Sequence, residues 1–461
     1  MPFDRKIFRD NDIRGIYPTD LDEGVMYKVG QALATKYKAK RVAVGRDMRV
    51  SGPSMQRALV DGFMSMGVRV YDLGMITTPI NYFAGSLMKV DLACIVSSSH
   101  NPKEYNGLII AKKNGAATTE AELEDIIRLS RAPTVLPGKR GSEQRKQIMG
   151  LWIDHVFGII SPKEIKPMKV VFDTGNGVEA VELEPALERL PQIKAIKMFF
   201  EPDGNFPNHI PNPLLSKTLV GLRKRVKKEK ADVGFSYDGD GDRVIMVDEK
   251  GKAVEGSVMT AYLAKYFLEH RRYSVKPAML YTSVMSRIVP EKIEEYGGRA
   301  LKAPVGHSLI KAMMRQKHAL FAGEHSGHFY FKDNYYADSA LVGTLVLLAA
   351  ISSDPRPLSE QLKEFRVYAK QEEISVKVQD RDEFIDGMRK ALEGGKTTLG
   401  KPKKVTGGDG VTFDFEEFWF NLRPSGTEPV VRLNIEAYKA DKLEGIVKKI
   451  LSVVRRLDGD V

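Results

Sequence analysis

Residues 41–73 read RVAVGRDMRVSGPSMQRALVDGFMSMGVRVYDL, and this stretch decides the fold class. Arg41–Gly45 and Val68–Leu73 are short runs rich in β-branched residues, which is typical of buried strands. The segment Pro53–Met66 between them favours a helix, and a further apolar strand is expected at Asp91–Ser97. Strand, helix and strand at this spacing predict a βαβ unit and therefore an α/β domain.

The same alternation recurs further along the chain, which at 461 residues is too long for a single hydrophobic core. It predicts a second and a third α/β unit, whereas the final unit has strands with few helices between them and reads as α+β. The expected elements of these units are strands at Lys169–Phe172, Asp232–Tyr237, Ala278–Tyr281, Ala319–Phe321, Glu373–Val378, Val411–Phe413 and Glu417–Leu422, and helices at 148–160, 217–229 and 338–351. Prolines near the expected boundaries give domains 1–160, 161–255, 256–365 and 366–461.

Composition narrows the class of protein. Hydrophobic residues make up 43% of the chain and charged residues 28%, which is ordinary for a globular protein. The longest apolar run, Ala340–Ile351, is too short to span a bilayer, and the charged start MPFDRKIFRD lacks an apolar signal core. A single cysteine, Cys94, cannot form an internal disulfide. We therefore expect a cytoplasmic protein without a membrane partner.

The net charge of +11 indicates an anionic partner, either nucleic acid or a small substrate. The basic residues are dispersed, and clusters such as Arg223–Lys230 resemble solvated helix faces without interleaved aromatic residues. We expect a small anionic substrate and no nucleic acid, with the protein acting as a monomer or homodimer.

Three carboxylates alternate with glycines in Asp238-Gly239-Asp240-Gly241-Asp242-Arg243. Converging carboxylates repel one another unless a cation joins them, and an all-oxygen set favours Mg²⁺ or Mn²⁺ over zinc. An EF-hand loop is an alternative, because Glu249 falls at its twelfth position. Its sixth position, however, requires glycine and holds Arg243, and the flanking segments alternate like strands. A solvated hairpin turn is the other alternative.

A phosphate carrier is expected near such a metal, because Mg²⁺ commonly completes its coordination with phosphate oxygens. Ser97-Ser98-Ser99-His100-Asn101-Pro102 directly follows the strand at 91–97, which is expected to place a hydroxyl on an exposed corner. Taken alone, this segment could also be an ordinary polar turn.

Four motifs together resemble the α-D-phosphohexomutase family: SSSHNP at 97–102, DGDGDR at 238–243, GEHSGH at 323–328 and RPSGTEP at 423–429. The resemblance extends from FRDNDIRG at 8–15, through VGRD at 44–47, over nearly the whole chain. It implies a heart-shaped molecule of four domains, three α/β domains with mixed sheets and a smaller α+β C-terminal domain.

The resemblance also implies roles for individual residues. Ser99 would carry a phosphoryl group, with Asp238, Asp240 and Asp242 holding a Mg²⁺ that the phosphoserine also binds. His100 and Arg243 would act beside Ser99 in catalysis. The substrate-binding residues would be Arg14, His307, Glu324 and Ser326 toward the sugar, and Arg423, Ser425, Gly426, Thr427 and Arg432 toward its phosphate.

The chain departs from the family pattern where acid/base chemistry is expected. Ile109 follows Asn106-Gly107-Leu108, at a place where a lysine is usual, and Pro304 lies where many members have a basic residue. The first lysine after that segment is Lys112, and the remaining candidates for proton transfer are His100, Lys103, Arg299, Lys302 and His307. Asn11 also replaces a more usual aromatic residue.

The resulting hypothesis is a mutase that interconverts hexose 1-phosphate and 6-phosphate, of mannose or glucose, with a hexose 1,6-bisphosphate as bound intermediate and activator. Two alternatives remain. One is an enzyme that prefers glucosamine phosphate, and the other is a catalytically silent protein that binds sugar phosphates.

Overall fold

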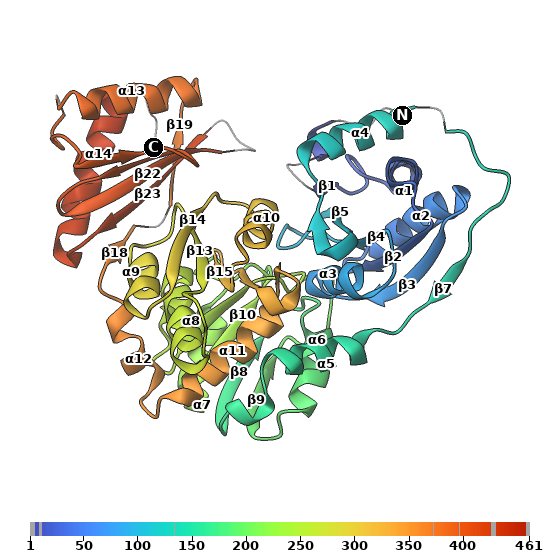
Figure 1. The fold of residues 1–461 in the computed structure, drawn as a ribbon, viewed down its shortest axis with the longest axis horizontal. Helices are drawn as coiled ribbons and strands as arrows, with labels where there is room; N and C mark the ends of the chain where they lie inside the picture. The colour runs from blue at the N-terminus through green and yellow to red at the C-terminus, as the bar shows by residue number, and fades with distance from the viewer. Residues whose placement is uncertain are drawn as a thin grey trace.

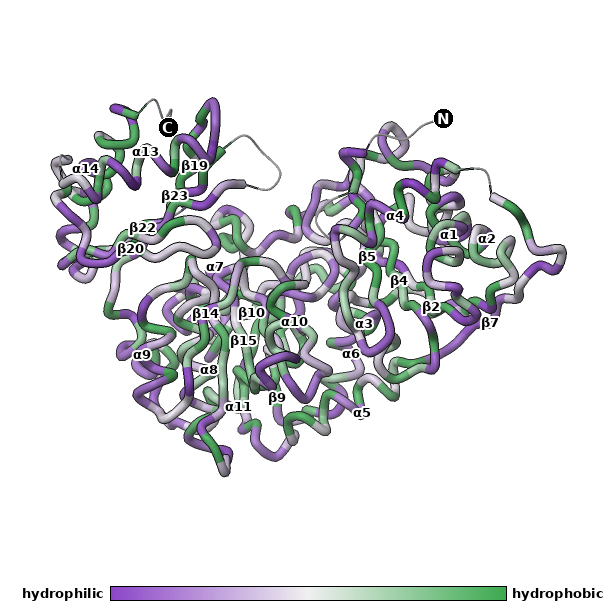
Figure 2. The backbone as a smooth tube through the Cα atoms, turned by 45° about the horizontal axis from the view of Figure 1, so that its top comes forward, coloured by the Kyte–Doolittle hydropathy of each residue, from purple (hydrophilic) through white to green (hydrophobic). Residues whose placement is uncertain are grey.

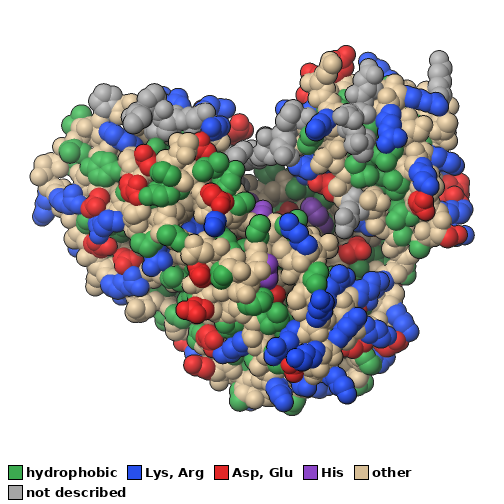
Figure 3. All heavy atoms as spheres, turned by 180° about the vertical axis from the view of Figure 1, so that it is seen from behind, with side chains coloured by type: hydrophobic (Ala, Val, Ile, Leu, Met, Phe, Trp, Pro, Cys, Tyr) green, Lys and Arg blue, Asp and Glu red, His purple; other side chains and the backbone are tan. Residues whose placement is uncertain are grey.

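The computed structural model describes residues 5–8, 12–132, 134–371, 373–395, 397–425 and 430–457. The chain forms four sheet-centred units, which we call domains I to IV in chain order. Domains I and IV form the two upper lobes of a heart, and domains II and III form its base (Figure 1). The space-filling view shows a deep notch between the two lobes, with histidine side chains at its floor (Figure 3).

Domain I is built on a mixed sheet of strand order β1-β5-β4-β2-β3-β7, in which β6 also pairs with β5. β4, β2, β3 and β7 are parallel, whereas β5 is antiparallel to both β1 and β4. The elements are η1 (Arg5–Ile7), β1 (Asp12–Ile16), α1 (Glu23–Tyr37), β2 (Arg41–Arg46), α2 (Gly52–Ser65), β3 (Arg69–Met75), α3 (Thr78–Leu87), β4 (Leu92–Val96), β5 (Tyr105–Lys112), η2 (Lys113–Gly115), β6 (Ala116–Ala117), α4 (Glu120–Arg131), β7 (Glu143–Arg145) and α5 (Met149–Ile159).

Domain II has the strand order β12-β11-β10-β8-β9, and its acidic motif forms the turn of the antiparallel hairpin β10–β11. The flanks of that motif are therefore strands, as predicted, and not the helices of an EF-hand. Its elements are η3 (Pro162–Glu164), β8 (Met168–Asp173), α6 (Ala180–Glu188), β9 (Ile193–Met198), α7 (Val220–Glu229), β10 (Val233–Tyr237), β11 (Val244–Asp248) and β12 (Ala253–Val254). Helix α7 begins three residues later than predicted because Thr218 closes a turn on the carbonyl oxygens of Asn212 and Leu215.

Domain III repeats the mixed arrangement with the strand order β14-β13-β15-β16-β17. Its elements are α8 (Gly256–His270), β13 (Ala278–Thr282), α9 (Ile288–Glu295), β14 (Arg299–Ala303), α10 (His307–Lys317), β15 (Phe321–Gly323), β16 (Phe329–Phe331), η4 (Lys332–Asn334), β17 (Ala337–Asp338), α11 (Ala340–Ser353), α12 (Leu358–Gln361) and η5 (Lys363–Phe365).

Domain IV differs because every strand pairing in its sheet is antiparallel, in the order β18-β23-β22-β21-β20 with β19 also on β23. This is the α+β unit predicted from the spacing of its strands. Its elements are β18 (Ala369–Lys370), β19 (Ile374–Lys377), α13 (Arg381–Glu393), β20 (Lys404–Thr406), β21 (Val411–Asp414), β22 (Phe418–Pro424), β23 (Val430–Ala437), η6 (Ala440–Lys442) and α14 (Leu443–Arg456).

The apolar cores follow the same division. One continuous core joins residues of domains I, II and III, from Ala43 to Phe365, and a second fills the other face of the domain I sheet. Domain IV has a core of its own, between Val376 and Val454. Domains I to III therefore share one packed core, whereas domain IV is a separately packed unit.

No single helix in the described part of the chain is both long and apolar enough to cross a membrane. Helix α11 and the segment Leu358–Phe365 are long and apolar enough only when taken together, and the chain bends by 88° between them. Residues 340–352 of α11 are buried, so its apolar character is explained by packing inside domain III.

Candidate active site

Ser99 follows the buried central strand β4, at the carboxyl edge of the domain I sheet. Its backbone has a φ of 49°, in the left-handed region that non-glycine residues rarely occupy. The backbone N–H donates to Ser97 Oγ at 3.1 Å, which holds the turn. The hydroxyl faces inward, with Oγ 3.0 Å from His100 Nδ1 and 3.2 Å from Asp238 Oδ2. The expectation of an exposed corner was wrong, since Ser99 is only 1% exposed and domain II covers it.

Arg49 holds the turn that contains Ser99, which we call the serine turn (residues 99–105). This role was not predicted from the sequence. Its fully buried guanidinium donates hydrogen bonds of 2.7–2.8 Å to four backbone carbonyl oxygens, and it also forms a buried ion pair with Asp47. Four carbonyl acceptors from one segment hold that segment in a single shape. The acceptors belong to Ser99, Asn101, Pro102 and Tyr105.

The acidic hairpin turn brings Asp238, Asp240 and Asp242 together, with one oxygen of each within 4.8 Å of the others. The glycines permit this approach to the serine turn. A Cβ on Gly239 would lie 2.4 Å from the Ser99 carbonyl oxygen, and Gly241 has a φ of 76°. Asp238 Oδ1 accepts hydrogen bonds from the backbone N–H groups of Asp242 and Arg243, both at 3.2 Å. The three carboxylates are thus already close together, and Asp238 is the one that contacts the Ser99 hydroxyl.

The three carboxylates interact strongly because all are buried. Burial and repulsion from Asp242 raise the pKa of Asp240 to about 6, and burial and both other aspartates raise the pKa of Asp238 far above its usual range. Burial also opposes ionisation of Asp242, but His328 and Arg243 outweigh it and hold its pKa below the usual range. Asp240 Oδ1 is buried and has no hydrogen-bond partner. An orphaned carboxylate oxygen among repelling acids fits a site for a divalent cation with oxygen ligands.

Thr78, at the start of α3, ties domain I to the acidic turn. Its Oγ1 donates to Asp240 Oδ2 at 2.6 Å, and its backbone N–H donates to the Asp240 carbonyl oxygen at 2.9 Å. Thr78 is not among the site residues predicted from the sequence. A signal existed, because Thr77 and Thr78 precede Pro79 directly after β3, at the same carboxyl edge as Ser99.

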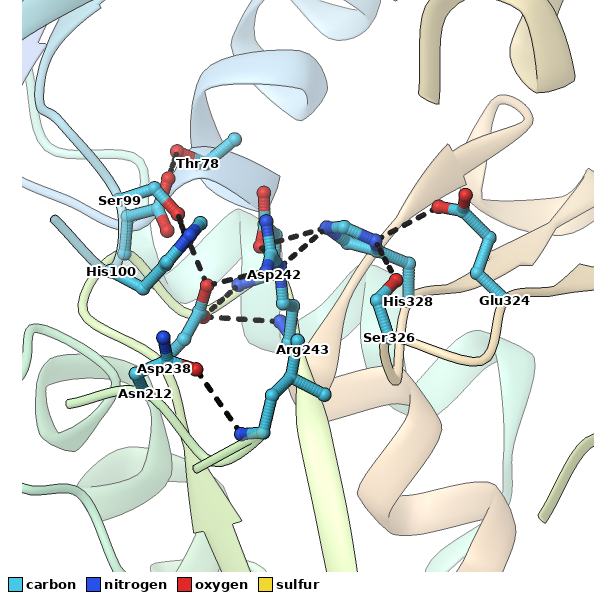
Figure 4. Close-up of polar contacts among 12 residues, drawn as sticks. Thr78, Ser99, His100, Asn212, Asp238, Asp242, Arg243, Glu324, Ser326 and His328 are labelled. Carbon is cyan, nitrogen blue, oxygen red and sulfur yellow. Dashed lines mark hydrogen bonds and ion pairs between the residues drawn. The ribbon is translucent and has the colours of Figure 1, made fainter. Parts of the chain in front are cut away.

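The GEHSGH loop of domain III meets the acidic turn from the side opposite Ser99 (Figure 4). His328 lies between two carboxylates, with Nε2 3.2 Å from Asp242 Oδ1 and Nδ1 2.9 Å from Glu324 Oε2. Ser326 Oγ lies 3.0 Å from His328 Nδ1, and Tyr330 Oη donates to Glu324 at 2.6 Å. Burial and Arg243 disfavour the charged imidazole, but the two carboxylates outweigh them and raise the pKa of His328 to about 10. His328 belongs to the GEHSGH motif, but no role was predicted for it from the sequence.

Arg14 and Arg243 add positive charge around the turn. Arg14 pairs with Asp12 at 2.8 Å and lies 3.4 Å from Asn101 Oδ1, beside the serine turn. Arg243 Nε lies 3.0 Å from His328 Nε2 and 3.5 Å from Asp238 Oδ2. Both predicted arginines therefore lie at the same centre as Ser99 and the acidic triad.

His307 begins α10, and its pKa is lowered by burial and by the neighbouring cations Lys311 and His328. Lys311 itself is fully buried, 2.9 Å from Asp338 and 3.3 Å from the ring centre of Tyr82 in domain I. His307 thus lies near the GEHSGH loop, as the resemblance implied, next to a buried charged contact between domains I and III.

Around Ile109, the described structure offers no lysine in place of the one that the family pattern leads one to expect. Ile109 is 7% exposed and belongs to the apolar core, and Lys112 pairs with Glu122 inside domain I at 2.7 Å. Among the described candidates for proton transfer, His100 is the residue that contacts the Ser99 hydroxyl, with Nδ1 3.0 Å from Oγ.

The described residues of the RPSGTEP motif begin at the end of β22 in domain IV, which forms the other lobe. Its strands pair so that Arg423 on β22 is directly opposite Arg432 on β23. Arg432 also donates to Ser375 Oγ at 2.6 Å. Ser425 is buried, with its N–H donating to the Val430 carbonyl oxygen at 2.9 Å, while the predicted Gly426 and Thr427 lie outside the described residues. Two facing arginines form a site suited to an anion.

Comparisons with known proteins agree with this geometry. Four family models of phosphoglucomutase/phosphomannomutase match in succession: alpha/beta/alpha domain I over residues 5–134, domain II over 151–251, domain III over 255–368 and the C-terminal domain over 373–453.

Individual relatives match over nearly their whole length. A phosphomannomutase of Methanocaldococcus jannaschii is 33% identical, covering 99% of each chain, and one of Escherichia coli K12 is 34% identical, covering 93% of this chain and 94% of the relative. The crystal structure of a phosphoglucomutase/phosphomannomutase family protein from Burkholderia thailandensis superimposes with a TM-score of 0.88 at 29% identity, over 99% of this chain and 98% of that one. The chain therefore belongs to the phosphoglucomutase/phosphomannomutase family of α-D-phosphohexomutases and is a mutase enzyme.

Proposed function

We propose that this phosphohexomutase interconverts the 1-phosphate and 6-phosphate of mannose, glucose or both, with Ser99 as the phosphoryl carrier. One observation carries the proposal: the Ser99 hydroxyl, held in a strained backbone, lies 3.2 Å from an acidic triad supplied by another domain. Curated relatives named phosphomannomutase support mannose as a substrate.

In the first step, the bond between phosphorus and Ser99 Oγ breaks while a free sugar hydroxyl forms a new bond to phosphorus. The hydroxyl proton is released and, in the overall balance, Ser99 Oγ gains one, so the product is a bound hexose 1,6-bisphosphate. His100 Nδ1, 3.0 Å from Oγ, lies where it can exchange that proton. In the second step, the other phosphate returns to Ser99 after the sugar has turned around, and the isomeric monophosphate leaves.

Asp238, Asp240 and Asp242 are the residues that would hold a Mg²⁺, together with an oxygen of phosphorylated Ser99. Such an ion neutralises charge that develops on a transferring phosphoryl group. Arg243 and Arg14 add positive charge at the same centre, and Thr78 holds Asp240 in place.

The substrate is bound from two sides in this proposal. Glu324, Ser326 and His307 lie where sugar hydroxyls can be hydrogen bonded, and His328 links this loop to the acidic turn. Across the notch, the phosphate that is not being transferred docks on domain IV. Its binding residues are Arg423, Ser425, Gly426, Thr427 and Arg432.

Intact-mass measurement tests the carrier. After incubation with Mg²⁺ and glucose 1,6-bisphosphate, we expect a mass gain of one phosphoryl group that is absent in Ser99→Ala. Ser98→Ala is the matched control, since Ser98 is equally buried but its hydroxyl contacts no polar partner among the described residues. An unmodified wild-type protein without turnover would support a silent binding protein and contradict the proposal.

A substrate panel tests the sugar. The purified enzyme is incubated separately with mannose, glucose and glucosamine 1-phosphates, and formation of each 6-phosphate is followed. We expect mannose or glucose phosphate to give the highest kcat/KM. A clear preference for glucosamine phosphate would overturn the assignment while leaving the phosphoserine step intact.

A further inference from the structure

A hollow lined by basic side chains lies on domain I, away from the notch that holds the candidate active site. It has a volume of about 710 Å³ and lies where β2 and β3 begin. One wall is the strap, which we define as residues 134–142, on the outer edge of domain I before β7 (Figure 1). Figure 2 shows hydrophilic residues along β7 and at the turn that precedes it. The cations that line the hollow are Lys40, Arg41, Arg69, Lys139 and Arg140.

These cations lack matching acids. Arg41 and Arg69 are paired residues of the parallel strands β2 and β3, so their side chains lie next to each other on one face of the sheet. Neighbouring like charges across strands are destabilising. Of the five cations, only Arg140 takes part in an ion pair among the described residues, with Asp61. No acidic residue in the described part of the chain lines the hollow, and the nearby Asp91 accepts hydrogen bonds from the backbone N–H groups of Lys40 and Arg41.

The end of the strap is held against domain I by backbone hydrogen bonds at Gly141 and Ser142. Gly141 N–H donates to the Met64 carbonyl oxygen at 2.7 Å, and Val70 N–H donates to that of Ser142 at 2.8 Å. A Cβ on Gly141 would lie 1.9 Å from the Val68 carbonyl oxygen, which explains glycine at this close approach. Lys139 and Arg140 directly precede this anchored end, and they line the hollow together with Arg69.

This hollow is distinct from the catalytic centre. The parallel strands β2, β3 and β4 all run from this edge of the sheet toward Asp47, Thr78 and Ser99. Six or seven residues of strand at roughly 3.3 Å each separate the two edges by about 20 Å. A ligand in the hollow therefore cannot touch the acidic triad.

We propose that the hollow binds a small anion with two or more phosphate groups, of the pyrophosphate or sugar-bisphosphate class. Its volume is in the range of small-molecule sites. Arginine and lysine side chains from three chain segments surround it, and paired arginines bind phosphate oxygens with two hydrogen bonds each. No aromatic side chain lines it in the described structure, which disfavours stacking of a nucleobase.

Calorimetric titration with inorganic pyrophosphate, at about 150 mM salt to screen diffuse attraction, tests the proposal. Arg423→Gln protein is used throughout, so that binding at the domain IV phosphate loop is weakened. We expect saturable one-to-one binding, weakened at least tenfold by Arg41→Gln/Arg69→Gln. Lys224→Gln/Lys228→Gln on α7 is the matched control, with the same charge change at two exposed lysines outside the hollow, and binding should be unchanged. Lys40→Gln/Lys139→Gln gives the same test if the arginine variant does not fold.

The comparison ligands separate the sources of the phosphates. Glucose 1,6-bisphosphate binding with the same variant dependence would assign the sugar-bisphosphate class, and pyrophosphate or tripolyphosphate alone the other. Orthophosphate binding as tightly as pyrophosphate would overturn the proposal, as would pyrophosphate binding that is insensitive to Arg41→Gln/Arg69→Gln. Binding only to vesicles of phosphatidylglycerol, or only to single-stranded DNA, would overturn it in favour of a macromolecular partner. The readout is binding, so it is independent of mutase activity.

Discussion

At the scale of single residues, the site depends on a few buried groups that make several contacts each. Arg49 is the clearest case, because one guanidinium serves four carbonyl oxygens of the serine turn and the carboxylate of Asp47. In the sequence, Arg49 only lies close to the VGRD motif at residues 44–47, and no contact could be predicted for it. Its role depends on contacts with residues 99–105, about fifty positions away, and such long-range contacts leave no local pattern.

We predict that Arg49→Met destabilises the protein by about 3–5 kcal/mol, as expected when one partner of a buried ion pair is removed. Because the serine turn would lose its fixed shape, phosphorylation of Ser99 should also fall. Urea unfolding and intact mass measure the two effects. Arg46→Met is the control, since among the described residues the Arg46 side chain donates only to the Asp47 carbonyl oxygen, and it is partly exposed. Equal effects of both substitutions would contradict the assigned role.

At the scale of elements, alternation of apolar residues predicted the hairpin around the acidic motif, and β10 and β11 were found within about one residue of the expected limits. The DGDGDR motif was enough to predict that the three aspartates lie together. The partners of the triad could not be derived in the same way, because Thr78 comes from α3 and His328 from the loop after β15. Three domains must pack before these residues meet.

We predict that Mg²⁺ stabilises the wild-type protein by about 2.7 kcal/mol at a concentration of 100 Kd, because binding to the folded state alone shifts the unfolding equilibrium. Asp240→Asn should lose most of this gain. Without Mg²⁺, Asp240→Asn should be at least as stable as wild type, because it removes repulsion within the buried triad. Thermal unfolding with Mg²⁺ or EDTA measures both.

Asp154→Asn provides the control for charge, as its side chain is 64% exposed and far in sequence from the triad. Its Mg²⁺ response should match that of wild type. A full Mg²⁺ response in Asp240→Asn would show that the ion binds elsewhere.

The facing arginines on β22 and β23 give a second prediction at this scale. Arg423→Gln should raise KM for each hexose phosphate at least tenfold, because a bidentate phosphate contact is lost. The unliganded variant should be equally stable or more stable by up to about 1 kcal/mol, since the cross-strand repulsion from Arg432 is removed. Steady-state kinetics and thermal unfolding check this, with Arg389→Gln on α13 as a charge-matched control.

At the scale of the whole molecule, the α/β alternation and the chain length predicted the number and type of the domains. They did not predict that three domains share one core while the fourth has its own. Polar contacts join domain III to domain IV, such as Arg287 N–H to Glu436 at 3.1 Å, Val305 N–H to Asp409 at 3.0 Å and Lys370 to the Val284 carbonyl oxygen at 2.8 Å. Polar interfaces of this kind favour relative movement of domains.

We therefore predict two transitions in calorimetric unfolding of the full chain. Met388→Ala, in the core of domain IV, should shift only one of them, and Met246→Ala, in the shared core, only the other. Each substitution removes a fully buried methionine, at a cost of about 2–5 kcal/mol to its own unit. A single transition that moves equally in both variants would contradict independent packing of domain IV.

The left-handed backbone of Ser99 lowers the stability of the protein at the residue that we propose carries the phosphoryl group. A non-glycine residue in this conformation costs roughly 1–3 kcal/mol. Ser99→Gly should therefore give a protein that melts at a higher temperature and cannot carry a phosphoryl group, whereas Ser99→Ala keeps the strain and loses only the hydroxyl. A screen that rewards heat resistance alone would select the inactive glycine variant, so any effort to stabilise this enzyme has to be scored on activity at the same time.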